Sequence, residues 1–173
     1  MSTVKVGFST SDWWVSRLIR ADTHSTVSHT FLLVEGLAAP FDQLILEAAW
    51  CGWRLSTLDR LCTGSTHVVE WATPQLPLDK GLQLAMGWLG EPYNYTGIFG
   101  MPWVELGKIF GQRWGNPFPG VHHMFCSEAV TYVLQADDYP GAAALDPRAE
   151  DPEALRSFCR AAGMTMETAT TAP

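Results

Sequence analysis

Basic residues are few in this sequence, and they are scattered. Lysine and arginine together number 11 against 18 aspartates and glutamates, which gives the chain of 173 residues a formal net charge of −7. A nucleic-acid-binding surface needs clustered lysine and arginine, and the sequence contains no basic run. We therefore predict that nucleic acid is not a partner of this protein.

Long apolar stretches and a secretion signal are also lacking. No apolar stretch reaches the roughly 18 residues of a membrane-spanning helix, so we predict no membrane span. Residues 1–9 have no charged region followed by a long apolar core, so they do not form a signal peptide. We expect a cytoplasmic protein, which lysis would release if a phage encodes it. The sequence indicates no particular oligomeric state.

Cysteine pairs with metal-binding spacing are missing. The four cysteines are Cys51, Cys62, Cys126 and Cys159, and no two of them form a CxxC pair. Without a secretion signal we expect reduced thiols, and a structural zinc site is disfavoured. His122 and His123 precede Cys126 in a single HHxxC motif, which lacks the second ligand pair of a zinc site. We predict no metal and no organic cofactor.

The composition provides enough apolar side chains for a core. Hydrophobic residues make up 47% of the chain, including eight tryptophans and eight phenylalanines. No internal repeat or linker divides the chain. We predict one domain over residues 1–163, followed by a flexible C-terminal tail over 164–173.

Hydrophobic periodicity predicts the order of the elements. Strands are predicted at 3–9, 27–35, 44–50 and 67–72, with an edge segment and a helical turn over 54–61. Helices are predicted at 13–20, 78–89, 103–110, 126–136 and 152–163. In the first helix we expect Trp14, Leu18 and Ile19 to form the apolar face. Strands that precede helices in blocks indicate an α+β fold with a central antiparallel sheet packed against helices.

Cys126 has the position of an activated nucleophile. A turn-forming segment, 116–120, comes just before it, and the residues after it repeat at helical spacing. A thiol in the first turn of a helix faces unpaired backbone N–H groups and the positive end of the helix dipole. This position favours the thiolate, which is the reactive form.

His29 and Glu47 are candidates for the base and its orienting group. His29 begins a buried strand and can take the thiol proton and later protonate a leaving amine. Glu47 lies in the middle of the next strand, where an unpaired buried carboxylate would be costly. If the two side chains share one face of adjacent antiparallel strands, Glu47 can hold the second imidazole nitrogen of His29.

Several alternatives remain open from the residues alone. Glu70 competes with Glu47 as the orienting group, and His123 competes with His29 as the base. His24 and His67 are expected at the surface or at strand ends. A buried cysteine is also often a simple apolar core residue, and a strand histidine is often structural.

The order of the motifs resembles a known family. Ser28-His29-Thr30, Leu46-Glu47-Ala48 and Cys126-Ser127-Glu128-Ala129-Val130 follow one another as in the circularly permuted, YiiX-like branch of the NlpC-type papain-like cysteine amidases and peptidases. In that branch the histidine strand precedes the cysteine helix. The stretches 8–20, 90–95 and 146–158 are similar to further parts of the family, so the resemblance covers most of residues 4–163. The aromatic insert at 96–120 departs from the family pattern.

The resemblance implies a permuted papain-like fold and a thiol hydrolase. It implies Cys126 as nucleophile, His29 as base, Glu47 as orienting residue and Tyr93 as an oxyanion donor, with Tyr95 as the alternative to Tyr93. The implied reaction is cleavage of an amide bond in a small peptide or other acyl-amide, with bacterial cell-wall stem peptides as the leading substrate class. Two other interpretations stay open: a thiol acyltransferase similar to the lecithin retinol acyltransferase group, and a non-catalytic binding or structural protein.

Overall fold

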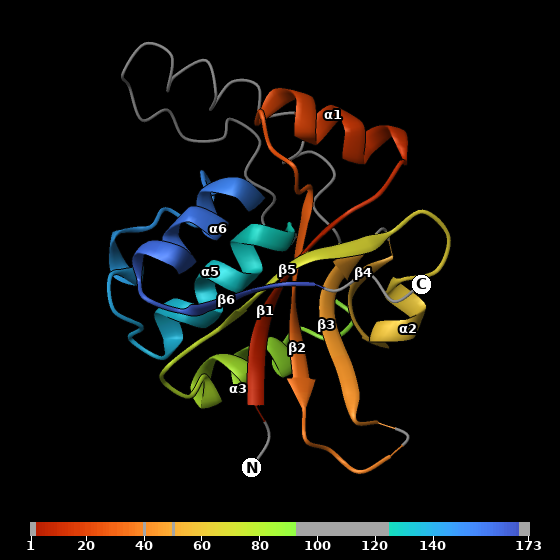
Figure 1. Cartoon of the computed structure of the whole chain (residues 1–173). Helices are drawn as coiled ribbons and strands as arrows, with labels where there is room; N and C mark the ends of the chain where they lie inside the picture. The colour runs from red at the N-terminus through yellow and green to blue at the C-terminus, as the bar shows by residue number, and fades with distance from the viewer. Residues whose placement is uncertain (1–2, 40, 50, 93–124, 170–173) are drawn as a thin grey trace.

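Apolar strands build an antiparallel sheet at the centre of the protein. The computed structural model describes residues 3–39, 41–49, 51–92 and 125–169. Within these residues the sheet has six strands, in the spatial order β4-β3-β2-β1-β5-β6 (Figure 1). The strands are β1 (Thr3–Thr10), β2 (His29–Glu35), β3 (Gln43–Ala49), β4 (Gly52–Thr57), β5 (His67–Thr73) and β6 (Thr165–Thr168). Every neighbouring pair is antiparallel.

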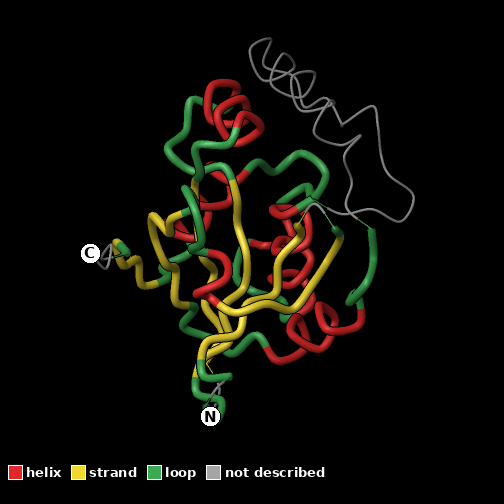
Figure 2. The backbone as a smooth tube through the Cα atoms, turned by 90° about the vertical axis from the view of Figure 1, so that its right-hand side faces the viewer, coloured by secondary structure: helices red, strands yellow, loops and turns green. Residues whose placement is uncertain are grey.

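The helices differ in how they meet the sheet. They are α1 (Trp14–Asp22), α2 (Leu58–Leu61), α3 (Asp79–Gly87), α5 (Cys126–Ala136) and α6 (Pro152–Ala161), with a 3-10 turn at Ala142–Ala144. α5 packs on β2 and β3, and α3 and α6 contact α5, so these three helices form a layer beside the sheet (Figure 2). α1 lies at one end of the sheet, apart from that layer. Among the described residues, none of the helices has the length and hydropathy needed to span a bilayer.

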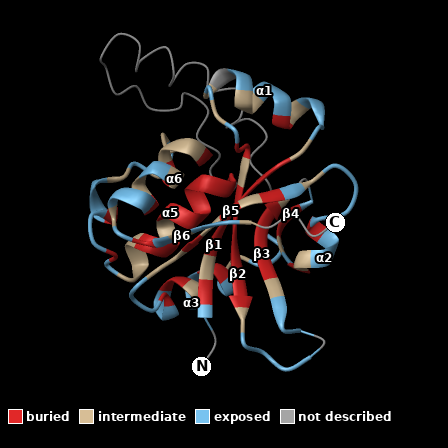
Figure 3. Ribbon diagram, in the orientation of Figure 1, coloured by how far each residue is buried: buried red, intermediate tan, exposed pale blue. Residues whose placement is uncertain are grey.

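Both faces of the central strands are buried (Figure 3). One apolar cluster joins the sheet to α3, α5 and α6 through residues that include Phe8, Leu32, Leu46, Val130 and Leu134. A second cluster contains Phe31, Leu33, Ile45, Leu61 and Val68, and α2 supplies one of its members. Side chains alternate between the two faces of a strand. β2 and β3 contribute to both clusters, which explains their continuous apolar runs.

The structure confirms most of the predicted elements and the α+β class with an antiparallel sheet. The predicted helix at 103–110 lies outside the described residues. The predicted flexible tail is wrong over 165–168, because these residues form β6 and pair with β5. β6 is a short edge strand with three exposed residues, so backbone hydrogen bonds hold it and its side chains give no alternating signal.

The apolar face predicted for the first helix does not pack on the core. Trp14 and Leu18 of α1 are 63% and 53% exposed. The buried side chain is Ser16, whose hydroxyl bonds to the hydroxyl of Ser28 and accepts a hydrogen bond from the N–H of Ser11. These polar contacts fix which side of α1 faces the protein.

Gly7 of β1 allows a phenylalanine ring to cover it. It lies directly opposite Phe31 of β2, and a Cβ atom at Gly7 would come within 2.3 Å of the Phe31 ring. That ring is completely buried. It lies edge-on to Trp71, with ring centroids 5.6 Å apart, and it stacks on His29 at 6.1 Å. Glycine is therefore required at this position because another side chain occupies the space of its Cβ.

We predict that Gly7→Ala destabilises the protein. The new methyl group must displace the buried Phe31 ring, and overpacking of this kind costs about 1–3 kcal/mol, which corresponds to a loss of about 3–10 °C in Tm. Gly87→Ala is the matched control, since nothing lies within 4 Å of a Cβ built there. Thermal unfolding followed by circular dichroism measures both variants. Equal Tm values for Gly7→Ala and the wild-type chain would contradict the packing described above.

Candidate active site

His29 and Glu47 meet across two neighbouring strands. The register pairs Leu32 with Leu46, which places Glu47 of β3 two residues away from the position opposite His29 and on the same face. The Nε2 atom of His29 lies 3.1 Å from the Oε2 atom of Glu47. The predicted contact between the imidazole and the carboxylate is therefore present.

Glu70, the rival orienting group, is engaged elsewhere. Its Oε2 atom accepts a hydrogen bond of 2.7 Å from Nη2 of Arg160 on α6. This ion pair ties α6 to β5. The other two histidines in the described residues, His24 and His67, are exposed, and His67 is the first residue of β5, as predicted.

Arg54 of β4 also binds Glu47, so that His29, Glu47 and Arg54 form a group of three. It lies directly opposite Glu47 in the register of β3 and β4. Its Nη2 and Nε atoms donate to Oε1 of Glu47 at 2.6 and 2.9 Å. Sequence reasoning missed this residue. The signal was available in the short connection between β3 and β4, because a tight turn before Gly52 makes positions 47 and 54 face each other.

The two partners keep the buried Glu47 ionised. Its side chain is only 3% exposed. Burial on its own raises the pKa of Glu47, but the hydrogen bonds and charges of His29 and Arg54 outweigh burial and lower that pKa below its usual value. The carboxylate therefore accepts a hydrogen bond from Nε2–H of His29, which fixes the orientation of the ring. This leaves Nδ1 to exchange a proton with another group.

Cys126 lies at the start of α5 and is buried. The residue before it, Phe125, is the extended N-cap of the helix and has no capping side chain. The first N–H groups of α5 are therefore open to the sulfur. The sulfur receives backbone hydrogen bonds from Thr30, the neighbour of His29, and from Ser127. The packing of α5 on β2 thus brings the cysteine to the histidine end of the sheet.

Cys126 and His29 shift each other's proton affinity in opposite directions. Burial raises the pKa of Cys126, but the His29 ring and the backbone hydrogen bonds lower it below its ordinary value. Burial lowers the pKa of His29, yet Cys126 and Glu47 raise it to about 10. Such opposed shifts describe a thiolate paired with an imidazolium, which is the activated form of a cysteine nucleophile.

Glu128 is a second carboxyl group in the first turn of α5. It accepts a hydrogen bond from the backbone N–H of Phe125, the usual contact of a glutamate at the third helical position. Burial raises the pKa of Glu128 to about 7, and Asp146 adds to the shift, while the Phe125 N–H and the charge of Arg148 oppose it. Glu128 therefore changes charge near neutral pH, two residues from Cys126.

Four residues singled out in the sequence lie outside the described residues: Tyr93, Tyr95, His122 and His123. The oxyanion role of either tyrosine, the competing base and the HHxxC motif therefore stay predictions. Within the part of the chain that the structure describes, no three His, Cys, Asp or Glu side chains are grouped so that they could hold a metal ion.

Comparison with known proteins gives little further information. No family model matches the chain, and no curated protein matches it. Among solved structures, the chain is similar to the metalloprotein yiiX from Escherichia coli O157:H7. The similarity has 17% sequence identity and a TM-score of 0.48, over 97% of this chain and 96% of that chain. This distant similarity assigns no activity, so the roles of Cys126, His29 and Glu47 remain predictions.

We predict that Cys126 is alkylated by iodoacetamide with an unusual pH dependence. The thiolate reacts, so the rate at an ordinary thiol falls about tenfold for each pH unit below its pKa. The lowered pKa of Cys126 keeps its rate high as the pH falls from 9 towards neutral, whereas burial raises the pKa of Cys62 and its rate falls. Peptide mapping by mass spectrometry measures both rates in one sample.

His29→Gln is the decisive variant for this measurement. Without the imidazolium, burial controls the thiol, and the rate at Cys126 near pH 7 should fall by about tenfold or more. Glu128→Gln removes the titration of Glu128, so the pH dependence that remains is that of the Cys126–His29 pair. If Cys126 and Cys62 lose reactivity in parallel as the pH falls, there is no ion pair between Cys126 and His29.

Proposed function

We propose that this protein is a cysteine amidohydrolase with Cys126 as nucleophile, His29 as acid and base, and Glu47 as the orienting residue. The observation that supports the proposal is the continuous contact from Arg54 through Glu47 and His29 to Cys126. These groups come from three strands and one helix, and each pairing is the one that thiol activation needs.

The chemistry runs in two steps. In the first, the Cys126 thiolate attacks the amide carbonyl, and the resulting tetrahedral oxyanion is stabilised by the backbone N–H of Cys126 at the helix start. The His29 imidazolium gives its proton to the amine, which leaves as the C–N bond breaks. In the second, neutral His29 takes a proton from water, the hydroxide attacks the thioester, and the thiolate leaves.

The proposed fold family is the permuted branch of the NlpC-type papain-like enzymes. Support comes from the chain order of histidine strand, glutamate strand and cysteine helix, together with an antiparallel sheet that α5 covers. The resemblance adds Tyr93 as a second oxyanion donor. It also adds small peptides, with cell-wall stem peptides first, as the substrate class to be tested.

We predict that Cys126→Ala abolishes turnover of such peptides while the fold is kept. The substitution removes the sulfur atom that forms the thioester in the proposed mechanism. Released amine is measured for a panel of small peptide amides, and the acyl-enzyme is trapped and located by mass spectrometry. Cys62→Ala is the matched control, since Cys62 is an exposed free thiol far from His29 in the chain.

The products of this assay separate the three interpretations. Free acid supports the hydrolase, whereas transfer of the acyl group to an added alcohol or amine in preference to water supports the acyltransferase. An active Cys126→Ala variant would remove the proposed nucleophile. Complete absence of both turnover and acyl-enzyme with the whole panel would favour a binding or structural protein.

We predict that Glu47→Gln lowers kcat by roughly 100-fold. The amide can still accept from His29, but it carries no charge to stabilise the imidazolium, so the pH–rate profile should also shift. Glu70→Gln is the matched control, since Glu70 is a buried glutamate paired with an arginine but not with His29. A loss of activity confined to Glu70→Gln would show that the orienting residue has been misassigned.

A further inference from the structure

Helix α1 exposes large apolar side chains to solvent. Trp13, which precedes the helix, and Trp14 and Leu18 within it are 59%, 63% and 53% exposed. The two indole rings contact each other, with centroids 6.1 Å apart. At about 100° per residue, these three side chains and the exposed Arg17 and Ala21 fall on one side of the helix. We call this side, residues 13, 14, 17, 18 and 21, the outward face of α1.

The outward face is held in position by polar contacts on the other side of the helix. The buried Ser16 hydroxyl bonds to Ser28 and to the N–H of Ser11. A rotation that buried the tryptophans would break the contacts of Ser16. The exposure of the apolar side chains is therefore a property of the fold.

The charge of α1 differs in sign from the charge of the whole protein. The helix carries the exposed Arg17 and the partly exposed Arg20 against one aspartate, Asp22, which gives it a formal net charge of +1. Asp12 precedes the helix, and its backbone N–H is bonded to Ser65. The chain as a whole carries a net charge of −7. A ligand that this face attracts should therefore be anionic as well as partly apolar.

The size of the face argues against a stable protein partner. A helix of nine residues is about 14 Å long, so its outward side covers roughly 150 Å². A stable protein interface buries about 800 Å² on each partner. Tryptophan, leucine and arginine on one helix side are the residues that enter the boundary between lipid headgroups and acyl chains, where a small contact gives useful reversible binding.

We propose that the outward face of α1 docks on an anionic lipid bilayer surface. Trp13, Trp14 and Leu18 enter the headgroup boundary, and Arg17 and Arg20 contact lipid phosphates. The proposal is independent of the proposed hydrolase function. Docking would also orient the candidate active site, because Ser28, which is bonded to Ser16 of α1, immediately precedes His29. Docking would turn the His29 end of the sheet towards the membrane.

Sedimentation with lipid vesicles tests the proposal on the full chain. Vesicles of phosphatidylcholine alone are compared with vesicles that contain about 30% phosphatidylglycerol. We expect the bound fraction to be several-fold higher on the anionic vesicles and to fall as salt is raised, since screening weakens contacts between exposed charges. The double variants Trp13→Ser/Trp14→Ser and Arg17→Gln/Arg20→Gln should each reduce binding about fivefold or more.

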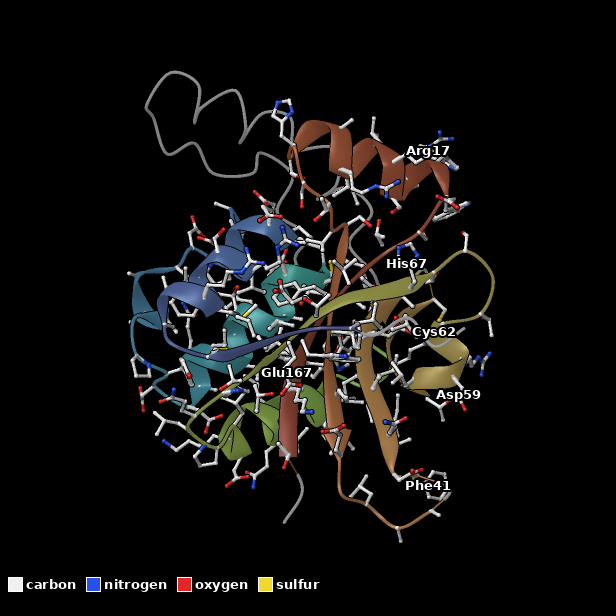
Figure 4. The ribbon with its side chains drawn as sticks, in the orientation of Figure 1. Arg17, Phe41, Asp59, Cys62, His67 and Glu167 are labelled. Atoms are coloured by element: carbon white, nitrogen blue, oxygen red, sulfur yellow. The ribbon has the colours of Figure 1, made fainter. Side chains whose placement is uncertain are left out.

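Phe41→Ser is the matched control. Phe41 is 57% exposed but lies on the turn between β2 and β3, at the opposite end of the molecule from Arg17 (Figure 4). Its removal should leave vesicle binding unchanged. Thermal unfolding confirms that each variant is folded, and hydrolysis of a soluble peptide amide, where the proposed activity is found, should stay at the wild-type rate in the tryptophan variant.

Three results would overturn the proposal. The first is a wild-type chain that binds neither kind of vesicle. The second is a tryptophan variant that binds anionic vesicles as well as the wild type does. The third is a wild-type dimer in solution that Trp13→Ser/Trp14→Ser converts to a monomer, since the outward face would then be an interface between two copies. None of these results depends on catalytic activity, so failure here and failure of the hydrolase proposal are distinguishable.

Discussion

The pairing of one buried carboxylate with two cations determines the electrostatics of the candidate site. Glu47 is almost completely buried, and without partners it would take up a proton. Arg54 and His29 bind its two oxygens separately, so the carboxylate stays charged while the imidazole keeps its orientation. A charged Glu47 favours a protonated His29, and a protonated His29 favours the thiolate of Cys126. The ionisation of the Cys126 sulfur therefore depends on the hydrogen bond between Arg54 and Glu47, although neither residue contacts the sulfur in the series of contacts described above.

Sheet register is the constraint that makes this pairing possible. A slip of one residue between strands would move every side chain to the other face. His29, Glu47 and Arg54 would then no longer meet. Slippage is opposed because β2 and β3 contribute to a different apolar cluster on each face, so a shift would exchange the side chains that fill the two clusters. The Phe31 ring, which covers Gly7 and stacks on His29, adds a steric restriction next to the site itself.

Sequence periodicity predicted most of the described elements and the contact between His29 and Glu47, because consecutive strands in an α+β fold usually pair and the alternation puts both residues on one face. Predicting the contact between Arg54 and Glu47 required the position of the turn between β3 and β4, which the hydrophobic pattern does not give. β6 was missed because backbone hydrogen bonds, with few apolar contacts, hold this edge strand. The apolar side chains predicted for the first helix do not show which side of α1 faces the protein, because Trp14 and Leu18 are exposed. The buried hydroxyl of Ser16, which bonds to Ser28 and accepts from the N–H of Ser11, orients that helix instead.

Two acidic groups share the start of α5, and their competition bears on the thiolate. Cys126 and Glu128 both draw on the N–H groups and the dipole of the first turn, and Glu128 takes the N–H of Phe125. A charged Glu128 also repels a charged sulfur. Because burial raises the pKa of Glu128 to about 7, a large part of its population is neutral at neutral pH. The helix start then acts mainly on Cys126. The His29 imidazolium and the helix start both favour the thiolate, and Glu128 carries only part of a negative charge near neutral pH.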